Sequence, residues 1–159
     1  MDFKIPSTFI RRRCHLTWHE VEFGLQNGWL TDDAAIDLAI DRVTAGDESA
    51  DVVALASVLP HEKDKAPQII RRLAERDPEC SNEKWLFLLL AWLYEHRDSI
   101  DEPLAVVEQL YADFDYPEAM AGFVRYMPPQ DPARVGEPYL LDAWRRFLDT
   151  VGRNYAPNQ

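Results

Sequence analysis

The sequence predicts an all-α fold, and two observations lead to that prediction. Apolar residues recur at three- and four-residue spacing along nearly every segment of the 159-residue chain. No stretch alternates apolar and polar residues for long enough to indicate a β-strand. We therefore expect one domain of eight or nine short helices around a buried helix at Trp85–Tyr94. Stacking of helical pairs as in an α-solenoid is an alternative arrangement. The domain should span 1–159, with frayed ends at 1–5 and 155–159.

The first strong helix signal is a capping box formed by Thr17 and Glu20. The helix that it opens should run to about Asn27, with Gly28 as the residue that ends it. Further helices are expected to begin near Thr31, Ser49, Pro67, Ser81, Asp101, Asp115 and Pro138.

Composition restricts the class of protein. The apolar fraction is 47 %, which is typical of a globular chain, and the two cysteines, Cys14 and Cys80, are too few for a disulfide framework. The longest apolar run, Trp85–Tyr94, has about half of the roughly 20 residues that span a bilayer. We expect a soluble, cytoplasmic protein with no membrane partner.

Negative charge is concentrated in two segments of a chain whose net charge is −11. The segment 14–62 holds ten acidic residues and one basic residue, and the segment 95–118 holds eight acidic residues and one basic residue. Such a charge distribution repels nucleic acid and attracts a basic protein. Some of the acids have a local role at helix N-termini, so the case for a basic partner rests mainly on the first segment.

The best candidate for a metal cluster is Cys14, His15, His19 and Glu22. Two histidines four residues apart can share a helix face and bind zinc. If Thr17 caps the helix, however, His15 lies outside it and the spacing loses its meaning. We therefore predict no catalytic residues, no metal site and no cofactor.

Basic and aromatic residues have simpler explanations than catalysis. The run Arg11–Arg13, and Arg71, Arg72 and Arg76, are expected to pair with the protein's own acidic surface. Trp18 and Trp29 lie in the first acidic segment, where an aromatic anchor ringed by acids would suit a protein interface. That hypothesis fails if both rings are buried.

Two stretches, Leu16–Leu30 (LTWHEVEFGLQNGWL) and Val107–Pro128 (VEQLYADFDYPEAMAGFVRYMP), resemble an uncharacterised bacterial family of all-helical domains. The resemblance covers most of the chain and implies no activity or catalytic residues. By analogy alone, small acidic bacterial proteins of this kind include toxin-immunity proteins. In the second stretch, Asp115 is placed to cap the next helix, and Arg125 to pair with Asp113 or Asp115.

The function that we expect is that of a non-enzymatic acidic binding protein, an immunity protein that masks a basic, nuclease-type bacterial toxin. A helical adaptor of another complex and a small metal-dependent hydrolase using His15 and His19 are the alternatives. The oligomeric state is left open. The expected partner-binding residues are Glu20, Glu22, Trp29, Asp32, Asp33, Asp37 and Asp41.

Overall fold

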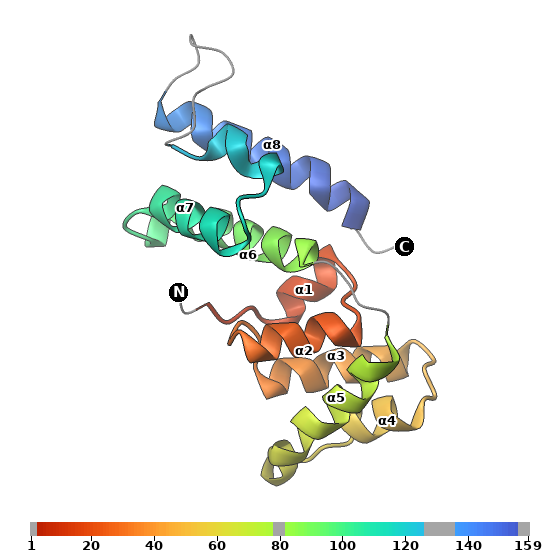
Figure 1. Ribbon diagram of the computed structural model, residues 1–159. Coiled ribbons are helices and arrows are strands. Elements are labelled where there is room, and N and C mark those ends of the chain that lie inside the picture. The colour runs from red at the N-terminus through yellow and green to blue at the C-terminus, as the bar shows by residue number, and fades with distance from the viewer. Residues whose placement is uncertain (1–2, 78–81, 126–135, 156–159) are drawn as a thin grey trace. The chain divides into compact units, whose positions relative to one another are not determined.

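The computed structural model describes residues 3–77, 82–125 and 136–155, and the regular structure of these residues is entirely helical. They form eight α-helices and three 3₁₀ helices, so the all-α prediction is confirmed. The chain divides into an N-terminal unit, Asp2–Trp85, and a C-terminal unit, Leu86–Ala156 (Figure 1). The predicted helix start at Ser81 lies outside the described residues.

The N-terminal unit is built from short helices whose packing partners follow from their apolar faces. Helix α2 packs against α5, α3 packs against α1 and α4, and α4 also contacts α5. The helices are α1 (Ser7–Arg13), α2 (Trp18–Gln26), α3 (Asp32–Thr44), α4 (Ala50–Ala56), the 3₁₀ helix η1 (Pro60–Lys65) and α5 (Ala66–Arg76).

Helix α2 begins with the predicted capping box. The backbone N–H of Glu20 donates to the Thr17 hydroxyl at 3.2 Å, and the backbone N–H of Thr17 donates to the Glu20 carboxylate at 2.9 Å. The helix ends at Gln26, and Gly28, two residues further on, has a φ of 76°, the left-handed conformation that glycine adopts without strain. Both ends of α2 are therefore encoded locally.

Trp85 is the central side chain of this unit and is fully buried. Its indole Nε1–H donates to the Glu20 carbonyl at 2.7 Å, and its ring lies 5.5 Å from that of Trp29. Gly24 sits directly under the indole, because a Cβ atom built there would lie 2.1 Å from the Trp85 ring. The absence of a side chain at Gly24 thus sets how closely α2 approaches this ring.

Helix α6 (Glu83–Glu95) contributes Trp85 to the N-terminal unit and Leu86 onward to the C-terminal unit. Its predicted burial is confirmed, since every residue from Trp85 to Leu93 is buried except the partly exposed Trp92. The other helices of the C-terminal unit are η2 (Arg97–Ser99), α7 (Pro103–Asp113), η3 (Glu118–Phe123) and α8 (Glu137–Tyr155).

Trp144 of α8 is the buried aromatic centre of the C-terminal unit. Its ring meets Tyr94 edge-on at 5.1 Å and stacks on Phe123 at 6.4 Å. The indole Nε1–H of Trp144 is buried and has no hydrogen-bond partner among the described residues. The described packing therefore accounts for the apolar ring of Trp144 but not for its polar group.

The prediction that Asp115 caps a following helix is wrong. Asp115 and Tyr116 have φ values of 61° and 55°, and their N–H groups donate to the carbonyls of Ala112 and Tyr111 at 3.1 and 2.8 Å. These two bonds form a Schellman motif, so Asp115 ends α7 instead of starting the next element. The next helix is the 3₁₀ helix η3, which has Pro117 at its N-cap.

One further local prediction for this region is wrong. Arg125 pairs with Glu108, through Nε at 2.7 Å and a second nitrogen at 3.2 Å, and not with Asp113 or Asp115. Glu102 occupies the N-cap of α7 but makes no side-chain capping bond. Its charge, close to the positive end of the helix dipole, and Pro103 at the first helical position both support the start of α7.

Candidate functional site

A row of three carboxylates lies along one face of α3. Asp33, Asp37 and Asp41 follow one another at four-residue spacing, which places them on adjacent turns of the same side of the helix. Thr31 fixes the start of α3, since its hydroxyl accepts a hydrogen bond from the N–H of Ala34 at 3.1 Å. The local cap thus determines the register of the acidic row.

Each carboxylate of the row has a contact from a distant part of the sequence. Arg11 Nε lies 2.7 Å from Asp41, and Lys63 Nζ lies 2.8 Å from Asp33. The hydroxyl of Ser7 donates to Asp37 at 3.1 Å. Both ion pairs are exposed, with 67 % of the Asp33 side chain accessible, so each is worth at most about 1 kcal/mol.

Apolar side chains are also exposed on this helix. Ile40 follows Asp33 by two helical turns and is 44 % exposed, and Val43 one turn further is 37 % exposed. Ile36, Ile40 and Val43 recur at helical spacing, but of these three only Ile36 is buried. The acidic row therefore has an apolar residue beside it, an arrangement found at protein interfaces.

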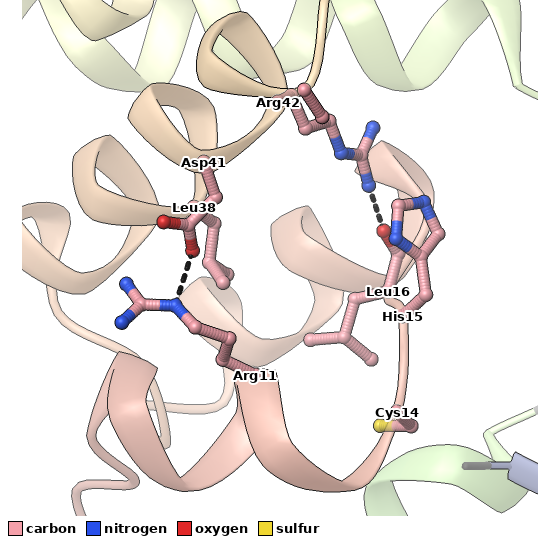
Figure 2. Close-up of a pocket in the computed structure, with 8 residues that line it drawn as sticks. Arg11, Cys14, His15, Leu16, Leu38, Asp41 and Arg42 are labelled. Atoms are coloured by element: carbon pink, nitrogen blue, oxygen red, sulfur yellow. Dashed lines mark hydrogen bonds and ion pairs between the residues drawn. The ribbon is translucent and has the colours of Figure 1, made fainter. Parts of the chain in front are cut away.

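A pocket of about 250 Å³ opens at the C-terminal part of the row, where α1 and α3 meet the segment Cys14–Leu16 (Figure 2). The ion pair between Arg11 and Asp41 forms part of its wall. On another part of the wall, Arg42 donates a hydrogen bond to the Leu16 carbonyl. The Arg42 guanidinium also lies 4.3 Å from the centre of the Trp18 ring. Burial lowers the pKa of this guanidinium.

Cys14 and His15 line this pocket, and their ionisation and contacts do not match those of a catalytic pair. Burial raises the pKa of the Cys14 thiol to about 12, so the thiol is protonated at neutral pH and is a poor nucleophile. Partial burial, followed by the nearby charge of Arg42, lowers the pKa of His15. The two groups have no hydrogen bond that would join a base to a nucleophile.

The histidines do not assemble into a metal site in the described part of the chain. Thr17 caps α2, so His15 precedes the helix and His19 lies within it. Within residues 3–77, 82–125 and 136–155, no three His, Cys, Asp or Glu side chains gather closely enough to hold a metal ion. Among the same residues, no helix has both the length and the apolar character needed to cross a membrane.

Two of the predicted contact residues are buried and serve the fold. Glu20 is 4 % exposed and binds the Thr17 N–H and the Lys84 ammonium, the latter at 3.1 Å. Trp29 is 8 % exposed and packs edge-on against Phe23. Trp18 is 4 % exposed. The aromatic-anchor hypothesis for Trp18 and Trp29 is therefore wrong, because neither ring presents a face to a partner.

The remaining predicted residues, Glu22 and Asp32, border a separate groove between α2 and α5. Arg71 and Lys4 also line this groove, and neither was predicted to belong to a site. The sequence held no signal for them, because Lys4 and Arg71 come together only when the first residues of the chain and α5 reach α2.

Three of the arginines that were predicted to pair with the acidic segment do so in the described part of the chain, and Arg71 does not. Arg72 and Arg76 both bind Asp51, at 3.3 and 3.0 Å, and Arg11 binds Asp41. These pairs reduce the charge that the N-terminal unit presents to a partner. Within the segment 14–62 they leave five acids without an ion pair to any described residue: Glu22, Asp32, Asp37, Asp47 and Glu48.

Comparison with known proteins places this all-helical chain in a family of bacterial proteins. A family model described as an uncharacterized protein conserved in bacteria, DUF2247, matches residues 7–152. The chain belongs to this family, and the predicted resemblance to a bacterial domain family is confirmed. Searches of curated proteins and of solved structures return no match.

Proposed function

We propose that this chain is a non-enzymatic acidic binding protein of the bacterial cytoplasm that covers a basic partner, a nuclease-type toxin that it neutralises. The observation that carries the proposal is the acidic row Asp33, Asp37 and Asp41 of α3, with exposed Ile40 beside it. Carboxylates would steer a basic partner to this face, and the apolar side chain would give it a contact from which water is excluded.

The existing ion pairs of the row are compatible with partner binding. The pairs of Asp33 with Lys63 and of Asp41 with Arg11 are exposed, and exchanging one for a pair with a partner's cation costs little. Asp37 accepts a hydrogen bond from the Ser7 hydroxyl and makes no ion pair with any described residue. The row therefore acts as a set of replaceable contacts.

The direct test is binding between the chain and the product of the neighbouring gene. We expect a basic toxin, a complex that weakens as salt is raised, and rescue of growth when the chain is expressed with that toxin. If the neighbouring gene encodes no toxin and pull-downs at low salt return no basic protein, the proposal fails. Capture of a partner that is not a toxin would instead favour an adaptor role.

A charge-matched pair of variants locates the contact. The triple variant Asp33→Asn, Asp37→Asn and Asp41→Asn should weaken binding at least about tenfold, chiefly through a slower association rate. The control variant Glu48→Gln, Asp64→Asn and Glu75→Gln has the same net charge and alters exposed acids away from the row. Equal losses of affinity in the two variants would show that only net charge matters, and would contradict an interface at α3.

A further inference from the structure

The groove between α2 and α5 has the size and lining of a small-ligand site. Its volume is about 520 Å³, within the range of roughly 300–1,000 Å³ typical of ligand pockets. Leu25, Leu30, Pro67 and Ile70 supply apolar lining from α2, from the turn before α3 and from α5. An apolar ligand body would therefore lose contact with water on entering this groove.

The charged groups of the groove include both signs. Glu22 and Asp32 supply two carboxylates, and neither has an ion-pair partner among the described residues. Arg71 supplies a guanidinium that also lacks one, and it is exposed. Lys4 Nζ donates to the Gly28 carbonyl, which holds the ammonium group at the edge of the groove.

This combination selects against ligands that carry a single charge. A purely cationic ligand would meet Arg71 and Lys4, and a purely anionic ligand would meet Glu22 and Asp32. A ligand with one ammonium group, one carboxylate and an apolar body between or beside them would match all of the groups. Free apolar amino acids and short apolar peptides have that chemistry at neutral pH.

We infer that this groove binds a zwitterionic apolar ligand, an apolar amino acid or a short apolar peptide. The ammonium group of the ligand lies against Glu22 and Asp32, its carboxylate lies near Arg71, and its side chains cover Leu25 and Pro67. The inference does not depend on the proposed toxin partner, because the occupant is a small molecule and the groove is distinct from the acidic row of α3.

The test is an NMR titration of the full chain, labelled with ¹⁵N, with leucine, Leu-Leu and Leu-Leu-Leu at millimolar concentration. We expect the amide resonances of residues around the groove to shift. Tightest binding of leucine would indicate an amino-acid site, and tightest binding of Leu-Leu or Leu-Leu-Leu would indicate a peptide site. N-acetyl-Leu-Leu, which lacks the ammonium group, and Leu-Leu-amide, which lacks the carboxylate, should each bind about threefold to fivefold more weakly than Leu-Leu.

Paired variants assign each charge to its partner. The double variant Glu22→Gln and Asp32→Asn should weaken the binding of Leu-Leu several-fold but leave the binding of N-acetyl-Leu-Leu unchanged. The variant Arg71→Gln should likewise weaken the binding of Leu-Leu several-fold but leave the binding of Leu-Leu-amide unchanged. Glu48→Gln with Asp64→Asn, and Arg12→Gln, are matched controls at exposed positions outside the groove and should bind Leu-Leu normally. No shift with any of the three ligands, shifts confined to other surfaces, or variants that behave like their controls would overturn the inference.

Discussion

At Gly24, the missing side chain is what allows α2 to lie against Trp85. A Cβ atom at this position would lie 2.1 Å from a ring carbon of a fully buried indole that also donates to the Glu20 carbonyl. We therefore expect Gly24→Ala to lower the free energy of unfolding by about 1–3 kcal/mol, measured by urea denaturation. Gly122→Ala is the control, because nothing lies within 4 Å of a Cβ atom there, and it should be close to neutral. Equal effects of the two changes would contradict the packing role of Gly24.

The Cys14 thiol should be chemically inert in the folded chain. At pH 8 only about one thiol in ten thousand is ionised when the pKa is about 12, and the side chain is buried as well. In a Cys80→Ser background, we expect a thiol reagent to modify Cys14 very slowly in buffer and rapidly in concentrated urea. Rapid modification of the folded protein would show that Cys14 is accessible and ionised.

His15 should make stability depend on pH below its usual titration range. Its pKa is lowered from 6.5 in the folded chain, so below that value the unfolded chain takes up the proton more readily than the folded chain does. The stability associated with neutral His15 is thus present above pH 6.5 and is lost as pH falls through the lowered pKa. The variant His15→Gln should not show this loss. In thermal denaturation, the stability difference between wild type and the variant should therefore become smaller as pH falls from 6.5 to the lowered pKa. Parallel curves for the two proteins would contradict the shift.

At the scale of elements, capping residues differ in what they contribute. The Thr17 hydroxyl accepts a hydrogen bond from the Glu20 N–H and completes a capping box, whereas the Ser49 side chain at the N-cap of α4 makes no capping hydrogen bond. We expect Thr17→Ala to lower the free energy of unfolding by about 1 kcal/mol and Ser49→Ala to change it much less. Chemical denaturation of both variants checks this, and similar losses would mean that the box adds nothing to α2.

Elements whose ends are encoded by neighbouring residues could be predicted from the sequence. The starts of α2 and α3 at Thr17 and Thr31 follow from side chains within three residues of each N-cap. The end of α7 could not be predicted in this way, because Asp115 is as acceptable at a helix start as in a left-handed turn. The bond from the Tyr116 N–H to the Tyr111 carbonyl decides between the two, and it forms only once α7 exists.

The site was predictable in composition more than in detail. Spacing alone places Asp33, Asp37 and Asp41 on one face of α3. It does not show that Lys63 reaches Asp33 from thirty residues away, or that Glu20 faces inward to Lys84. It also does not show that Ile40 is exposed, because helical periodicity does not tell which part of an apolar stripe a neighbouring helix covers.

For the molecule as a whole, net charge decides which polymers it can approach. With a net charge of −11, the chain should repel DNA, and we expect no change in the anisotropy of a labelled duplex titrated with the protein at low salt. A labelled polylysine peptide should bind under the same conditions and dissociate as salt is added. An increase in the DNA signal would contradict the expected preference for basic partners.

The ion pairs of the N-terminal unit have a consequence for the order of events during synthesis. Glu20, Asp33 and Asp51 leave the ribosome before their partners Lys84, Lys63 and Arg72, and Trp85, which packs on Gly24, emerges later still. The nascent segment 14–62 is therefore strongly negative and lacks its central aromatic residue while it lies near ribosomal RNA, which repels it. Co-translational folding of this unit should wait until residue 85 has cleared the exit tunnel, and the acidic segment should remain extended until then.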